Sequence, residues 1–227
     1  MASEVTFIDT KGDTPDEFAP RPAKDMTPEW WKKLSASWME PESILDKRRS
    51  QTVKRCVPML DMVTSGYLLV TPSDVHISMR DGVQYHEWPD QEIIQIHATN
   101  QVGEHPSAEG RSGIPKWIQP WAIMTPRGYS CLFMTPAHHP VPFRIFEAIV
   151  DTDRYHEAVT LPFTTVEGFT GTIPAGTPMA QVIPFRRDQF THRITTDSRP
   201  TALTKRLVFA SFIGGYRDRF WSRKQFD

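Results

Sequence analysis

Residues 75–88 read Val-His-Ile-Ser-Met-Arg-Asp-Gly-Val-Gln-Tyr-His-Glu-Trp, and this stretch decides the fold class. Apolar residues alternate with polar ones on both sides of Asp81-Gly82. A period of two is typical of a strand with one buried face, and Asp-Gly favours the left-handed backbone of a tight hairpin turn. The stretch therefore predicts two antiparallel strands, Val75–Met79 and Val83–Trp88, joined by a two-residue turn.

Short apolar or alternating runs continue along the chain on both sides of this hairpin, separated by turns such as Pro126-Arg127-Gly128. Many short strands at this spacing are typical of a barrel or a sandwich. We therefore expect a mainly β fold with a few peripheral helices at the N- and C-termini, and one long loop at Asn100–Pro115. The other predicted strands are Tyr67–Val70, Glu92–Ala98, Trp121–Met124, Tyr129–Met134, Arg144–Val150, Ala158–Thr164, Thr170–Ile173 and Met179–Phe185.

Four segments follow from this pattern: an extended arm (1–26), a helical lead-in (27–66), a β-rich core domain (67–185) and a basic helical tail (186–227). In the lead-in, Thr27-Pro28-Glu29 is a helix-start signal, and a second short helix is expected near Pro58–Val63. The first helix would carry three tryptophans on a short span, which suits packing on the domain or an interface with a partner. These are Trp30, Trp31 and Trp38.

The tail holds ten Lys and Arg residues against four Asp between residues 186 and 227, although the net charge of the whole chain is −1. A helix is predicted at Thr201–Ile213, followed by a last turn through Tyr216–Trp221. Such a tail can contact nucleic acid or an acidic partner, or can simply carry solvated charge. The residues expected at an interface are Arg217, Arg219, Trp221 and Arg223.

Several function classes lack support in the sequence. No apolar run is long enough to span a membrane, and Met1–Lys11 does not resemble a signal peptide, so we expect a soluble intracellular protein without membrane contact. Cys56 and Cys131 lie among apolar neighbours and are expected to be buried free thiols. No nucleotide-binding or nucleophile motif is present, and no cofactor is predicted.

The histidines offer one candidate metal site. His138-His139 lie in a proline-bounded loop, and His156 follows a strand end that bears Asp151 and Asp153. Two imidazoles and a carboxylate are a known ligand set for a catalytic metal. Adjacent histidines on an extended chain point in opposite directions, which favours surface or hydrogen-bonded histidines instead.

Residues 126–185 contain three motifs, at Pro126–Tyr129, at Val150–Tyr155 and at Gly176–Ile183, through which the chain resembles the closing half of the dUTPase and dCTP deaminase superfamily, which has a β-clip fold. Val150-Asp151 with Tyr155 match its hydrophobic-Ile-Asp-x-x-Tyr segment, and Pro126–Tyr129 match its Pro-x-Gly-Tyr turn. Its late strand, Gly-x-x-Ile-Ala-Gln-Leu, is matched by Gly176, Met179, Ala180, Gln181 and Ile183. The resemblance implies a β-clip-like barrel or sandwich and, for an enzyme, a site at Asp151, Tyr155 and Gln181.

The chain departs from that superfamily at positions where the superfamily binds its nucleotide. Leu68 stands where its Gly-Tyr-Asp segment has a carboxylate, and its phosphate-binding Arg-Ser-Gly segment is missing from Thr135–His139. Without those groups a pyrophosphatase would bind a triphosphate poorly. A nucleotide-binding or nucleotide-hydrolysing enzyme is therefore the alternative, and a metal-dependent enzyme is the second alternative.

A second resemblance covers nearly the whole chain. It is to a family of tailed-phage and bacterial proteins that has no assigned function, through segments at Pro22–Lys24, Pro28–Lys32, Thr52–Pro58, Ser65–Tyr67, Pro142–Ile145 and Tyr216–Lys224. This resemblance implies a phage setting, in the host cytoplasm or in a virion. Our first hypothesis is a non-enzymatic phage structural or assembly protein whose terminal arms contact further copies of the chain or other phage structural proteins.

Overall fold

The predicted hairpin at residues 75–88 forms as two antiparallel strands, β6 (Val75–Arg80) and β7 (Val83–Glu87), which pair from His76–Glu87 to Arg80–Val83. The computed structural model describes residues 3–38, 50–80, 83–89, 92–105, 113–195 and 215–227. The turn residues Asp81 and Gly82 lie outside these ranges. The register nevertheless requires a two-residue connection, as the sequence predicted.

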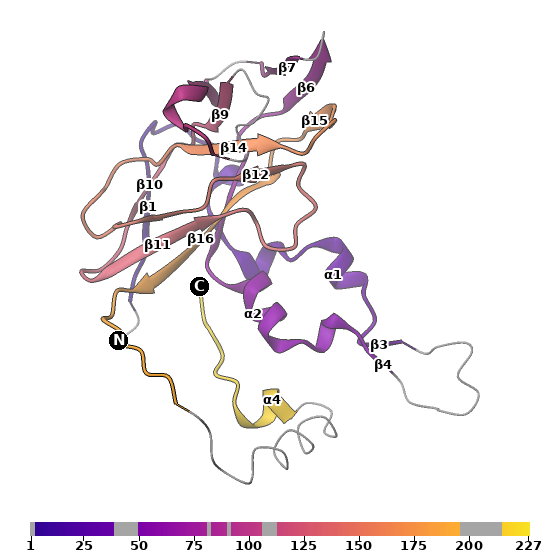
Figure 1. Cartoon of the computed structure of the whole chain (residues 1–227), viewed down its shortest axis with the longest axis vertical. Coiled ribbons are helices and arrows are strands. Elements are labelled where there is room, and N and C mark those ends of the chain that lie inside the picture. The colour runs from indigo at the N-terminus through magenta and orange to yellow at the C-terminus, as the bar shows by residue number, and fades with distance from the viewer. Residues whose placement is uncertain (1–2, 39–49, 81–82, 90–91, 106–112, 196–214) are drawn as a thin grey trace.

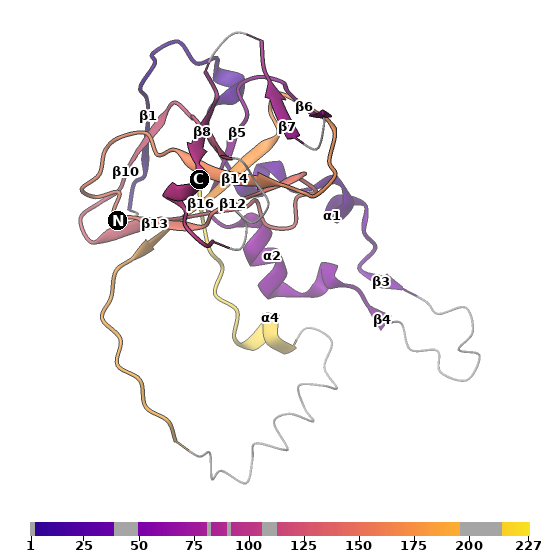
Figure 2. The same cartoon turned by 45° about the horizontal axis from the view of Figure 1, so that its top comes forward.

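The fold is mainly β, with antiparallel sheets in a sandwich-like arrangement and short helices beside it (Figures 1 and 2). The largest sheet has the order β13-β11-β16-β5-β2, and a four-stranded sheet has the order β12-β14-β9-β8. The first comprises β13 (Ala148–Val150), β11 (Tyr129–Met134), β16 (Pro178–Arg186), β5 (Tyr67–Val70) and β2 (Arg21–Pro22). The second comprises β12 (Phe143–Ile145), β14 (Leu161–Thr165), β9 (Gly113–Trp117) and β8 (Ile94–Ala98).

Smaller sheets complete the sandwich. A three-stranded sheet joins β15 (Gly171–Ile173) to β6 and β7, and β1 (Thr6–Asp9) pairs with β10 (Trp121–Met124). The helical elements are α1 (Glu29–Lys33), α2 (Val57–Thr64), α4 (Gly215–Arg219), η1 (Asp16–Phe18), η2 (Ala23–Met26), η3 (Val53–Arg55) and η4 (Thr99–Gln101). The short pair β3 (Ser37–Trp38) and β4 (Ser50–Gln51) extends from the α1 and α2 region (Figure 1).

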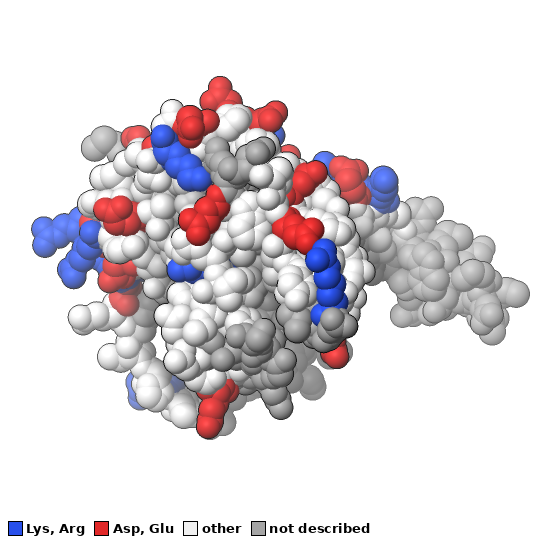
Figure 3. All heavy atoms as spheres, turned by 90° about the horizontal axis from the view of Figure 1, so that it is seen from above, with Lys and Arg blue, Asp and Glu red and all other residues white. Residues whose placement is uncertain are grey.

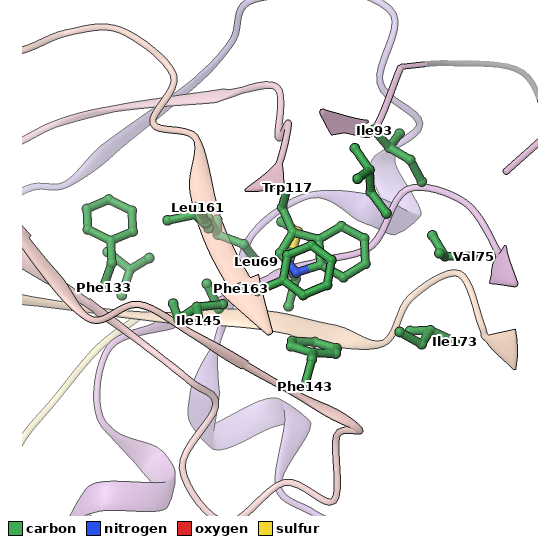
Figure 4. Packing of buried hydrophobic residues seen from close by; sticks show 14 of the residues in the cluster. Leu69, Val75, Ile93, Trp117, Phe133, Phe143, Ile145, Leu161, Phe163 and Ile173 are labelled. Atoms are coloured by element: carbon green, nitrogen blue, oxygen red, sulfur yellow. The ribbon is translucent and has the colours of Figure 1, made fainter. Parts of the chain in front are cut away.

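Three packed aromatic rings occupy the centre of the core (Figure 4). Trp117 and Phe163 stack with ring centroids 4.3 Å apart, and Phe143 meets both edge-on at 5.4 and 5.8 Å. All three side chains are fully buried. Since aromatic side chains bury more area than any others, this cluster from β9, β12 and β14 provides much of the apolar burial that holds the sandwich together.

Residues 3–26 are part of the β fold, because both β1 and β2 pair with strands of the core. Thr6 lies opposite Met124 and Asp9 opposite Trp121, and Arg21-Pro22 extend the largest sheet at β5. Beyond β1, both the amide and the hydroxyl of Thr10 donate to the Pro120 carbonyl, at 2.9 and 2.7 Å. The described part of the predicted arm is therefore attached to this chain at β1, at Thr10 and at β2, and it contains the short helices η1 and η2 rather than one extended run.

The first lead-in helix is shorter than predicted. α1 ends at Lys33, and Trp38 lies in β3, so the prediction that Trp38 shares a helix with Trp30 and Trp31 is wrong. The physical reason is local, because the Ser35 hydroxyl donates to the Ser37 carbonyl at 2.8 Å. Serine bonds of this kind compete with helical backbone bonds. The second helix, α2, forms where it was predicted.

Two further predictions need correction. Arg144–Val150 is two strands, β12 and β13, because β12 pairs with β14 whereas β13 pairs with β11. The Phe146 amide donates to the Pro162 carbonyl at 2.8 Å in the register of the β12–β14 pair, and proline has no amide that could return the bond. The strand predicted at Ala158–Thr164 begins at Leu161.

The helix predicted at Thr201–Ile213 lies outside the described residues, whereas the last turn forms as α4. In the described ranges, no helix combines the length and the apolar character that crossing a bilayer requires.

Candidate functional site

The candidate site lies where three neighbouring strands of the largest sheet begin or end. β11 is antiparallel to both β13 and β16, so its first residues lie beside the last residues of the other two. Asp151 and Asp153 follow β13, Arg187 follows β16, and Ser130 lies near the start of β11. Topology alone therefore brings two carboxylates, a guanidinium and a hydroxyl together.

Arg187 is the centre of this cluster. Its Nη1 donates to Asp153 Oδ1 at 2.8 Å and to the Tyr129 carbonyl at 2.9 Å, and its Nη2 donates to Asp153 Oδ2 at 2.5 Å. The Gly128 amide donates to the same carboxylate at 2.8 Å. A two-point pairing of guanidinium and carboxylate fixes both groups in orientation as well as in distance. The Arg187 and Gly128 bonds hold the pKa of Asp153 at about 2.

Asp151 is bound from one side and exposed on the other. Its Oδ1 accepts a bond from the Ser130 hydroxyl at 2.7 Å and lies 3.0 Å from Arg187 Nη1, and its side chain is 53% exposed. The Ser130 bond, and then the charge of Arg187, lower the pKa of Asp151. A general base works best when its pKa is near the working pH, so a carboxylate with a lowered pKa is a weak base.

The charges of the cluster do not suit a polyphosphate. Two carboxylates surround the Arg187 guanidinium, and the charge of Arg154 also acts on Asp153, so the cluster has no excess of positive charge. A triphosphate needs an excess of positive charge and free donors, whereas Nη1 and Nη2 of Arg187 already bind protein groups. The arrangement is chemically that of a clamp, which joins the ends of β13 and β16 to the turn at Gly128.

The predicted residue Gln181 lies elsewhere in the same sheet and is 1% exposed. Its Nε2 donates to the carbonyls of Met62 and Ser65 at 2.8 and 2.7 Å, and its Oε1 accepts from the Ala137 amide at 2.8 Å. These carbonyls belong to the C-terminal end of α2, where helices leave carbonyls without partners. Gln181 thus connects β16, α2 and the 135–140 loop from inside the core.

Tyr155 remains at the surface. Its amide donates to the Asp151 carbonyl at 2.9 Å, which places both residues on one turn, and its side chain is 48% exposed. Of the three residues that the β-clip resemblance implies for an enzyme, the structure therefore brings Asp151 and Tyr155 together. It places Gln181 in a separate buried network.

The histidines were predicted as candidate metal ligands. His139 is partly buried, and this burial, followed by the charge of His138, lowers its pKa to about 4. His138 has a left-handed backbone (φ 61°), and its carbonyl accepts a bond from Trp30 Nε1 at 2.7 Å. His156 follows the Asp151 turn. Among the residues that the structure describes, no group of three or more His, Cys, Asp or Glu side chains is placed to hold a metal ion.

The residues predicted at interfaces have different surroundings. Trp31 is 3% exposed, so it packs inside this chain, and Trp30 is 38% exposed beside His138. At the C-terminus, the Arg217 guanidinium lies 5.8 Å from the centre of the Trp221 ring. Arg219 ends α4, and Arg223 is exposed in the segment that follows.

The basic character of the tail is partly neutralised where it is described. Arg186 lies 3.3 Å from Asp188, Arg187 is paired with its two aspartates, and Lys224 lies 2.7 Å from Asp61. Arg199, Lys205 and Arg206 lie outside the described residues. Among the described residues on the face shown in Figure 3, basic and acidic side chains are interspersed.

Sequence reasoning missed Arg187, Ser130 and Asp61 as organising residues. Arg187 is one of ten basic residues in the last 42, and nothing in its neighbourhood along the sequence distinguishes it from a solvated charge.

Comparison of the chain with protein-family models and with curated proteins returns no match. The functional argument therefore rests on the geometry and on the two resemblances given above.

Proposed function

We propose that this chain is a non-enzymatic structural or assembly protein that contacts neighbouring subunits through a terminal segment. One observation carries the proposal. The last seven residues, 221–227, have no helix or strand, yet they bind the core through Trp221, Lys224, Phe226 and Asp227. A segment attached by its end through specific side chains is a common form of contact between subunits.

The use of the polar residues supports a structural role. The hydrogen bonds of Asp153, Arg187 and Gln181 join elements of the fold to one another. The pKa of Asp151 is lowered, away from neutral pH. Catalytic acids and bases usually have pKa values shifted towards the working pH. The phage setting of the proposal comes from the resemblance to the tailed-phage family alone.

The first test is native mass spectrometry of the purified chain over a range of concentrations. We expect oligomers whose share rises with concentration. We expect Asp151→Ala to leave their distribution unchanged, since Asp151 is not among the residues that bind the segment 221–227. A chain that stays monomeric at every concentration, alone and with other structural proteins of its phage, would contradict the proposal.

A nucleotide-handling enzyme remains the alternative, because Asp151 and Tyr155 are both about half exposed on one turn. The same spectra test it when a mixture of deoxynucleoside triphosphates is added. A gain of nucleotide mass, together with a turnover that Asp151→Ala abolishes, would favour the enzyme over the structural protein. Unchanged masses would favour the structural protein.

A further inference from the structure

The C-terminal segment (residues 221–227) has two points of attachment to the core, and the first is Asp61 on α2. Trp221 Nε1 donates to both carboxylate oxygens of Asp61, at 3.0 and 3.1 Å, and Lys224 Nζ donates to Oδ2 at 2.7 Å. The Asp61 side chain is only 17% exposed. Hydrogen bonds to a charged group are stronger than neutral ones, and partial burial protects them from solvent.

The second point of attachment lies at Tyr67 and Lys24. The Phe226 ring meets the Tyr67 ring edge-on with centroids 6.1 Å apart, and Tyr67 in turn packs against Phe7 at 5.0 Å. The Asp227 side chain forms an ion pair with Lys24. We call Lys24, Asp61 and Tyr67 the acceptor surface. It matches the segment in charge at both points, with Asp61 facing Lys224 and Lys24 facing Asp227.

Residues 188–195, which lie between β16 and the segment, have different surroundings. Every residue from 188 to 195 is exposed, and Phe190 and Ile194 are 87% and 91% exposed. Two large apolar side chains in water lack the stabilisation that burial would give. An arrangement in which this stretch lies against another protein surface would recover part of it.

The chain length allows such an arrangement. Residues 188–214 number 27 between Arg187 and α4, and an extended chain of that length spans up to about 90 Å. A domain of this size is about 40 Å across. Residues 188–214, which we call the tether, are therefore long enough for the C-terminal segment to reach the acceptor surface of an adjacent copy as well as that of its own core. The side-chain contacts would be identical in both cases.

We infer that the C-terminal segment of one copy occupies the acceptor surface of a second copy in the assembled protein. This inference rests on the proposed function and names the partner and the contact. The exchanged and the self-bound forms have the same contacts, so their balance depends on protein concentration and on what else is buried between copies. The exposed Phe190 and Ile194 on the tether favour the exchanged form.

The unaltered full-length protein can test this through the Asp61–Lys224 contact. Equal amounts of unlabelled and ¹⁵N-labelled chain are mixed in denaturant, refolded together and treated with a carbodiimide, which joins a carboxylate directly to an amine. We expect cross-linked peptides that contain Asp61 and Lys224 in mixed-isotope pairs as often as in same-isotope pairs. Cross-links found only in same-isotope pairs, or no such cross-link, would overturn the inference.

Two full-length variants give an independent test. Asp61→Lys removes the acceptor, and Trp221→Ala with Phe226→Ala removes the segment's anchors, so each alone should weaken self-association at least about tenfold. Mixed together they should form one-to-one pairs, because each retains the half that the other lacks. Gln225→Ala, an exposed position in the same segment, is the matched control and should associate like the wild type.

The outcomes separate this inference from the proposed function. Oligomers that persist unchanged in both variants, each shown to be folded by its circular dichroism, would refute the exchange and the C-terminal segment as the contact. They would leave an assembly protein that uses another surface. Protein that is monomeric in every mixture would refute both.

Discussion

Replacing Gln181 with methionine should destabilise the protein severely, because it leaves three backbone groups, two of them buried and one partly buried, without the partner that Gln181 provides. Methionine has nearly the same length and volume as glutamine, so the core stays filled. The Ala137 amide and the carbonyls of Met62 and Ser65 lose the bonds that Gln181 provides. A buried group left unsatisfied costs about 1–3 kcal/mol, so we expect a loss of about 3–6 kcal/mol after partial relaxation.

Such a loss is large against a total stability of about 5–15 kcal/mol for a typical domain. Urea unfolding measures it: the midpoint should fall while the dependence on urea concentration is unchanged, since the surface exposed on unfolding is nearly the same. Gln95→Met on the edge strand β8 is the control and should change the free energy of unfolding by less than about 0.5 kcal/mol. A loss below about 1 kcal/mol for Gln181→Met would refute the view that Gln181 terminates α2.

Three further changes test other parts of the structure. Gly66→Ala should destabilise by at least about 2 kcal/mol in urea unfolding, because Gly66 has a φ of +70° and an added Cβ would lie 2.0 Å from a carbonyl oxygen of β16. Phe163→Ala, at a fully buried ring, should cost about 3–5 kcal/mol in the same measurement. Asp153→Asn should lower the unfolding midpoint above pH 4, and its difference from the wild type should disappear between about pH 4 and pH 2. The reason is that the stabilisation from a lowered carboxyl pKa, about 2 here, is lost as the pH falls through it.

Matched variants separate these effects from nonspecific damage. Gly12→Ala has a comparable φ of +80° but open space around the added Cβ, so it should cost less than Gly66→Ala. Phe190→Ala, at 87% exposure, should leave the stability of the isolated chain nearly unchanged. For Asp153→Asn, a difference from wild type that is the same at pH 2 and pH 6 would contradict the pairing with Arg187.

The parts of the fold that local pattern determines were predictable. The strands at Tyr67–Val70, Trp121–Met124 and Tyr129–Met134 have the predicted bounds, because alternating or apolar runs end at glycine or proline signals close by. The register of β6 and β7 also follows from the two residues between them. These elements needed information from fewer than about ten neighbouring residues, as hairpins and turns do.

What depends on distant partners was not predictable. Nothing near Arg187 indicates that β13 and β16 both flank β11, so the clamp with Asp153 could be recognised only from the sheet order. The same applies to the division of Arg144–Val150 into β12 and β13, because it depends on their pairing with two different strands, β14 and β11. Of the residues named from the sequence for an enzyme site, Asp151 belongs to the described cluster, Tyr155 lies on the same turn, and Gln181 lies in a separate buried network.

The position of β16 between β5 and β11 also has a consequence for biosynthesis. Leu68 in β5 pairs with Gln181 in β16, a separation of 113 residues (181 − 68). At a translation rate of about 5–20 residues per second, β5 waits about 6–23 s for its partner to leave the ribosome. During that time Leu68, Leu69 and Val70, all destined for the interior, have no strand beside them on that edge. We therefore expect the nascent chain to need a holding chaperone and to complete its folding only after release.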